Sequence, residues 1–71
     1  MKVGKYNCEV YEKDGKYVVS FVDDYNIEHR LIVEDISENS ILDNINKYLY
    51  GYEIDGVRIP GYYDIYKNKL R

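Results

Sequence analysis

Residues 5–22 read KYNCEVYEKDGKYVVSFV and determine the first half of the fold. Apolar and polar side chains alternate from residue 5 to residue 12, which is the period of a half-buried β-strand. Asp14-Gly15 then predicts a short hairpin turn, because glycine accepts a positive φ. Residues 17–22 are rich in β-branched and aromatic side chains and are expected to form the second strand. The core face of this hairpin is predicted to carry Tyr6, Cys8, Val10, Tyr17, Val19 and Phe21.

The period of the sequence changes after a third strand. A turn is expected at residues 23–26, and residues 27–34 alternate again as a strand. Helical spacing follows, with apolar side chains at i, i+4, i+7, i+8 and i+11, namely Ile41, Ile45, Tyr48, Leu49 and Tyr52. Ser37 is the expected N-cap and Gly51 the expected stop, so a helix is predicted over residues 38–50.

The last third of the chain has weaker signals. Asp55-Gly56 predicts a second hairpin between residues 52–54 and 57–59. Residues 62–67 fit either a final strand or a short helix, and residues 68–71 are expected to fray. Residues 1–71 are therefore predicted to form one small α+β domain. Its three- to four-stranded antiparallel sheet has a β-β-β-α-β-like order, with one helix packed on one face.

Tyrosine dominates the aromatic composition, with ten tyrosines, one phenylalanine and no tryptophan in 71 residues. A chain this small cannot bury ten phenol rings completely, and exposed tyrosines are favoured in recognition surfaces. The single cysteine, Cys8, excludes an intramolecular disulfide and fits a cytoplasmic protein. No apolar run approaches the roughly 20 residues of a membrane span, so no membrane partner is expected.

Catalysis and metal binding find no support in the sequence. His29 is the single histidine, and one histidine on a strand is more often structural than catalytic. Asp23, Asp24 and Glu28 cluster at a turn, but their spacing does not match a calcium-binding loop. We expect a non-enzymatic protein without cofactor or metal.

Protein binding is the first functional hypothesis. The face of the sheet opposite the helix would meet solvent, yet it is expected to carry unusually many apolar side chains. Acidic residues flank this face. With a net charge of −3, the middle of the chain is acidic and would attract a basic surface on a protein target. The candidate binding residues are Tyr11, Val18, Val22, Asp23, Asp24, Tyr25, Ile32, Glu34 and Asp35.

Two alternatives remain open from the sequence. Aromatic and basic residues near the C-terminus could bind single-stranded nucleic acid by stacking and phosphate contacts. The candidate residues for this role are Arg58, Tyr62, Tyr63, Tyr66, Lys67 and Lys69. The second alternative is a self-associating structural module, a homodimer formed through the apolar sheet face.

Residues 1–50 contain five short motifs that follow one another in a fixed order along the chain. They are Tyr6-Asn7-Cys8-Glu9-Val10, Asp14-Gly15, Tyr17-Val18-Val19, residues 29–33 and Ser37-Glu38. In this order the segment resembles a HicB-like antitoxin domain, and it differs from that family at residues 24–27 and 39–41. The resemblance implies a degenerate ribonuclease-H-like sheet and a small partner-neutralising protein, an antitoxin or an anti-defence protein of phage or mobile-element origin.

Overall fold

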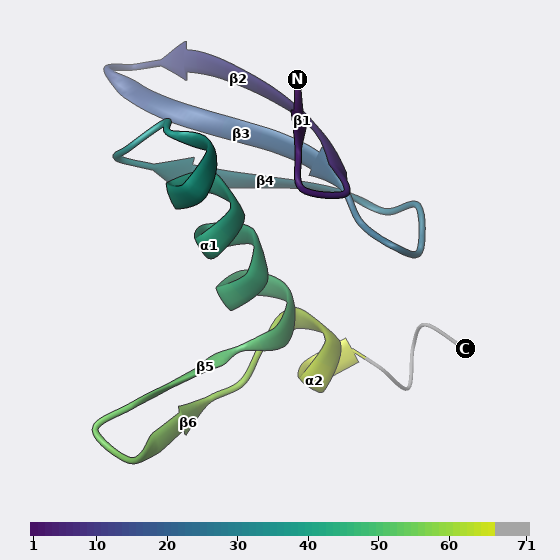
Figure 1. Cartoon of the computed structure of the whole chain (residues 1–71), viewed down its shortest axis with the longest axis vertical. Helices are drawn as coiled ribbons and strands as arrows, with labels where there is room; N and C mark the ends of the chain where they lie inside the picture. The colour runs from purple at the N-terminus through teal and green to yellow at the C-terminus, as the bar shows by residue number, and fades with distance from the viewer. Residues whose placement is uncertain (67–71) are drawn as a thin grey trace.

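The computed structural model describes residues 1–66 and confirms the α+β class (Figure 1). An antiparallel sheet in the order β1-β2-β3-β4 consists of β1 (Lys2–Val3), β2 (Tyr6–Lys13), β3 (Lys16–Val22) and β4 (Glu28–Val33). The rest of the chain forms α1 (Glu38–Tyr50), a hairpin of β5 (Tyr52–Ile54) and β6 (Val57–Ile59), and α2 (Tyr62–Tyr66). The predicted fraying of residues 68–71 falls outside the described residues.

Both predicted hairpin turns are present. Asp14 and Gly15 have φ values of 54° and 77°, and Asp55 and Gly56 have φ values of 50° and 77°. Two consecutive positive φ angles define the type I′ turn, whose twist matches that of the flanking strands. The Asp-Gly dipeptides therefore set the register of both hairpins.

The fourth strand of the sheet comes from the N-terminus and not from the segment after the helix. Lys2 and Val3 pair with the start of β2, across a turn in which Gly4 has a φ of 58°. The segment after α1 instead closes on itself as β5–β6, a separate two-stranded sheet. Figure 1 shows this hairpin extending away from the main sheet beyond the end of α1. Residues 62–66, for which the sequence left two possibilities, are helical.

The core lies between α1 and one face of the sheet. Ser37 caps the helix, accepting a hydrogen bond from the Ser40 N–H at 3.4 Å. The core consists of Val3, Tyr6, Cys8, Val19, Phe21, Val33, Ile41, Ile45 and Leu49. Two residues of the predicted apolar faces are placed differently. Tyr17 lies next to the Asp14-Gly15 turn and is 37% exposed, and Tyr52 belongs to β5 because the helix has already ended.

Two glycines hold the hairpin where it leaves the helix. The backbones of Gly51 and Gly61 touch, so that a Cβ on Gly61 would collide with the Gly51 nitrogen and the Leu49 carbonyl oxygen. The Gly61 N–H donates to Asp64 Oδ2 at 2.8 Å, the bond that an acidic third residue makes to the cap of its own helix. Arg58 also donates to Asp64 and to the carbonyl oxygen of Tyr50. The hairpin ends and α2 are thus fixed to the C-terminus of α1.

We predict that Gly61→Ala lowers the free energy of unfolding by about 3 kcal/mol, because the added methyl group meets backbone atoms that cannot move aside. Gly56→Ala is the matched control, since a Cβ there meets nothing and the cost is the positive φ alone, about 1 kcal/mol. Urea denaturation followed by circular dichroism measures both. A Gly61→Ala variant as stable as the wild type would contradict the close glycine contact.

Candidate functional site

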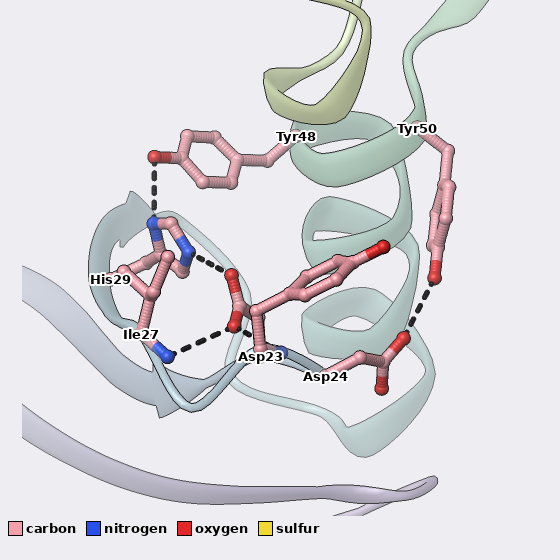
Figure 2. Close-up of polar contacts among 7 residues, drawn as sticks. Asp23, Asp24, Ile27, His29, Tyr48 and Tyr50 are labelled. Atoms are coloured by element: carbon pink, nitrogen blue, oxygen red, sulfur yellow. Dashed lines mark hydrogen bonds and ion pairs between the residues drawn. The ribbon is translucent and has the colours of Figure 1, made fainter. Parts of the chain in front are cut away.

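A buried polar chain joins the sheet to α1 (Figure 2). Asp23 Oδ2 lies 2.7 Å from His29 Nε2, and His29 Nδ1 lies 3.0 Å from the Tyr48 hydroxyl. The side chains of Asp23 and His29 are 0% and 4% exposed. Because an ionised carboxylate only accepts hydrogen bonds, Nε2 carries the donated proton, and in the neutral ring Nδ1 accepts from Tyr48. Both ring nitrogens of the histidine are therefore used within the fold.

Asp23 also organises the turn between β3 and β4. Its Oδ1 accepts hydrogen bonds from the backbone N–H groups of Tyr25 at 2.8 Å and Ile27 at 3.0 Å. Burial acts to raise the pKa of this carboxyl, but the bonds from His29 and the two amides outweigh it and hold the pKa below its usual value. Asp23 is therefore a buried structural anion. Its predicted place in an exposed acidic surface is wrong, because the turn folds the carboxylate inward.

Most of the tyrosines pack against one another around this polar chain. The Tyr62 ring stacks on Tyr48 with centroids 5.8 Å apart and meets the edge of His29 at 4.6 Å. Tyr63 contacts both Tyr25 and Tyr50 at 5.3 Å. The connected rings are Tyr6, Phe21, Tyr25, His29, Tyr48, Tyr50, Tyr62, Tyr63 and Tyr66. This aromatic network attaches α2 to the body of the protein.

Three phenols of the network and the Cys8 thiol have raised pKa values. Burial raises the pKa of Tyr48, Tyr6 and Tyr63 above the usual tyrosine value. Burial likewise raises the pKa of the Cys8 thiol. A protonated phenol or thiol is a poor nucleophile at neutral pH. The Tyr48 hydroxyl bonds His29 and the Cys8 thiol donates to the Tyr6 carbonyl oxygen, whereas the buried hydroxyls of Tyr6 and Tyr63 have no hydrogen-bond partner among the described residues.

The remaining acidic candidates do not form one patch. Asp24 accepts a hydrogen bond from Lys5 at 3.0 Å. It also accepts one from the Tyr50 hydroxyl at 3.2 Å, which Figure 2 shows. Glu34 and Asp35 are exposed, but they follow β4 whereas Asp24 precedes it. Strands rise about 3.3 Å per residue, which separates the two groups by roughly 20 Å. The predicted acidic block is thus divided between the two ends of the sheet.

The outer face of the sheet carries an apolar row, as the alternation predicts. The register places Tyr11, Val18 and Ile32 opposite one another across β2, β3 and β4. Val22 lies on the same face, nearer the β3–β4 turn, and is exposed. Tyr25, in that turn, is also exposed and packs against Tyr63. The row ends at Ile32, which is 65% exposed on the strand at the edge of the sheet.

An open groove begins where this row ends. Its volume is about 860 Å³, and it lies between β4, α1, the β5–β6 hairpin and α2. We call it the hairpin groove, and its lining is Leu31, Ile32, Asn44, Lys47, Tyr48, Tyr52, Ile54, Pro60, Gly61, Tyr62, Ile65 and Tyr66. Ile32 belongs both to the outer row and to the groove, so the two form one continuous apolar surface.

The hairpin turns one fully apolar face outward. Tyr52 pairs with Ile59 and Ile54 pairs with Val57, so these four side chains share a face, while Glu53 and Arg58 share the other. Ile54 and Val57 are 56% and 58% exposed, and Ile65 of α2 is 61% exposed. Such a concentration of exposed aliphatic side chains on a short hairpin is typical of a binding surface.

The residues proposed for nucleic-acid binding that the structure describes make contacts within the fold. Tyr62 and Tyr63 are half-buried in the aromatic network, and Arg58 is bonded to Asp64 and to a backbone carbonyl. Tyr66 lines the hairpin groove and packs on Tyr62. Lys67 and Lys69 lie outside the described residues.

Residues 1–66 contain neither a metal-binding cluster nor a membrane-spanning helix. Within residues 1–66 no group of three or more histidine, cysteine, aspartate or glutamate side chains is placed to hold a metal ion. Neither α1 nor α2, the helices described over the same range, has the length and apolar character needed to cross a bilayer.

Searches of protein-family models, of curated proteins and of solved structures find no match to this chain.

Sequence reasoning missed the aliphatic members of the site. Ile54, Val57 and Ile65 were not among the candidates, although the apolar-charged-apolar pattern of residues 52–54 and 57–59 already predicts a hairpin with one apolar face. Which way that face would point depends on the Gly51–Gly61 contact. No local pattern contains that information.

The buried Asp23–His29 pair gives a stability prediction. Asp23→Ala is expected to lower the free energy of unfolding by about 3 kcal/mol or more, because it leaves His29 and two backbone amides without their acceptor. Asp24→Ala removes an exposed ion pair with Lys5 and is expected to cost less than about 1 kcal/mol. Urea denaturation of both variants provides the comparison, and equal losses of stability would contradict the structural role of Asp23.

Proposed function

We propose that this chain is a non-enzymatic protein-binding module, which regulates or inhibits its target through the hairpin groove and the adjoining Ile32. The observation that carries the proposal is the exposed apolar face of the β5–β6 hairpin, on which Ile54 and Val57 lie next to the turn. An isolated two-stranded hairpin is marginal in water, and its apolar face gains from being covered. Full burial of one isoleucine side chain contributes about 1.5–3 kcal/mol.

The dimensions of the surface support a protein as the ligand. The hairpin groove, at about 860 Å³, exceeds a hollow of about 490 Å³ on the outer face of the sheet. That smaller hollow is lined by charged side chains including Glu9, Glu28 and Arg30. Apolar patches with a polar rim are typical of protein interfaces, with aromatic and aliphatic side chains as their anchors. Ile32, Ile54 and Tyr66 would supply such anchors.

The charges near the groove do not favour nucleic acid. Lys47 lines the groove, but its Nζ is 3.1 Å from Asp43 and lies over the Tyr52 ring. Nucleic-acid binding depends on cations that can neutralise phosphates. Catalysis is equally disfavoured, because His29 is buried with both nitrogens engaged.

The biological role belongs to the same proposal. Similarity of residues 1–50 to HicB-like antitoxin domains favours a protein that neutralises a partner, of antitoxin or anti-defence type. Glu34 and Asp35, exposed at the end of β4, would favour a target with a basic surface and would speed association. The aliphatic groove would supply most of the affinity, and the cytoplasm would be its place of action.

The proposal is tested by the variant Ile54→Asp, which places a charge on the exposed apolar face without disturbing the core. Immobilised wild-type protein is expected to retain a specific protein from a nuclease-treated lysate of the cells that express it. Ile54→Asp is expected to lose that protein, with binding weakened about a hundredfold by a buried unpaired charge. Glu53→Lys, on the opposite hairpin face, is the matched control and should retain it. Equal retention by all three proteins would contradict the proposed surface.

A further inference from the structure

The hairpin groove runs beside an unpaired edge of the main sheet. In the order β1-β2-β3-β4, strand β4 pairs with β3 on one side and has no partner strand on the other among the described residues. Unpaired N–H and C=O groups of an edge strand are a template for another extended chain. β4 has neither a proline nor a mismatch in its register to block such pairing.

The hydrogen-bond pattern identifies which backbone groups are available. Asp23 N–H donates to the Ile27 carbonyl oxygen at 2.9 Å, and hydrogen-bonded pairs in an antiparallel ladder alternate along the strand. Residues 29, 31 and 33 therefore direct their backbone groups to β3. The groups of Glu28, Arg30 and Ile32 point outward, to the free edge.

The groove meets this edge near the end of β4, at Leu31 and Ile32. Leu31 and Ile32 both line it, although successive side chains of a strand point to opposite faces. A hollow bounded by both must lie along the side of β4. Tyr52 and Ile54 of the apolar hairpin face and Tyr48 of α1 also line the groove.

At the other edge of the sheet, the beginning of β2 is already paired. Strand β1 pairs with the beginning of β2. Met1 extends this pairing, because the Cys8 N–H donates to the Met1 carbonyl oxygen at 2.7 Å and the Met1 amino group donates to the Cys8 carbonyl oxygen at 2.9 Å. Within residues 1–66, the β5–β6 hairpin is not packed against β2. The combination of free backbone groups with an apolar wall is therefore found at β4.

We propose that the partner enters the hairpin groove as an extended segment and adds a strand to β4. The inference rests on the proposed protein-binding function and specifies its mode. Backbone hydrogen bonds to Glu28, Arg30 and Ile32 give affinity, and pockets for alternate side chains give specificity. The partner segment carries apolar residues at alternate positions, which pack between Leu31, Tyr48 and the hairpin face.

The test uses linear peptides selected from a random library against the wild-type protein. Selected peptides are expected to have alternating apolar residues and to slow hydrogen exchange at the amides of Glu28, Arg30 and Ile32. In the free protein these amides are expected to exchange quickly, while those of His29 and Leu31 are already protected. Arg30→Pro removes one outward N–H and leaves the bonds to β3 intact, and it is expected to weaken peptide binding about tenfold.

Arg30→Ala is the matched control, because it removes the same side chain and keeps the N–H, so its binding should match the wild type. Binding that depends on Ile54 but is the same in Arg30→Pro and Arg30→Ala would overturn strand addition and leave the protein-binding function in place. Binding that ignores Ile54, or a failure to enrich any peptide, would overturn both. A dimer with protected Glu28 and Ile32 amides in the free protein would assign the edge to a second copy and contradict the proposal.

Discussion

A carboxylate buried without partners would be too costly to keep, and the fold is arranged around satisfying one. Asp23 is fully enclosed and obtains its hydrogen bonds from its own turn and from His29. The imidazole in turn bonds Tyr48 of α1, and Tyr62 of α2 packs on both rings. One anion thereby connects the β3–β4 turn, the long helix and the short helix. The hairpin groove adjoins this chain of contacts, because Tyr48 and Tyr62 also line it.

Beside a mostly aliphatic core, the aromatic network joins the elements of the fold. Tyr48 and Tyr62 join the elements together, because their rings stack on each other and the Tyr48 hydroxyl bonds His29. Aliphatic side chains, with Ile54 and Ile65 as examples, are left in contact with solvent. These exposed aliphatic side chains, and not those of the core, belong to the apolar surface around the hairpin groove.

Local patterns predicted local structure well. The Asp-Gly turns, the alternation in β2 and β3 and the Ser37 cap of α1 each depend on neighbouring residues, and all are present. The errors arose where distant parts meet. In the sequence Asp23 has the pattern of an exposed acidic turn residue, and its burial depends on the contact with His29. The segment after α1 has the pattern of a further strand of the main sheet, and its separate position depends on the contact between Gly51 and Gly61. Burial and close approach are properties of the assembled fold, so the sequence pattern could not reveal them.

The central claim is that the hairpin groove is open and apolar in the free protein. Methyl-resolved NMR with a soluble paramagnetic probe measures this directly, because line broadening reports the solvent exposure of each isoleucine. Strong broadening is predicted for Ile32, Ile54 and Ile65, and little broadening for Ile41 and Ile45, which are buried in the core. Protection of the first three to the level of the core pair would contradict the account, because it would mean that the hairpin closes over β4 and leaves no groove for a partner.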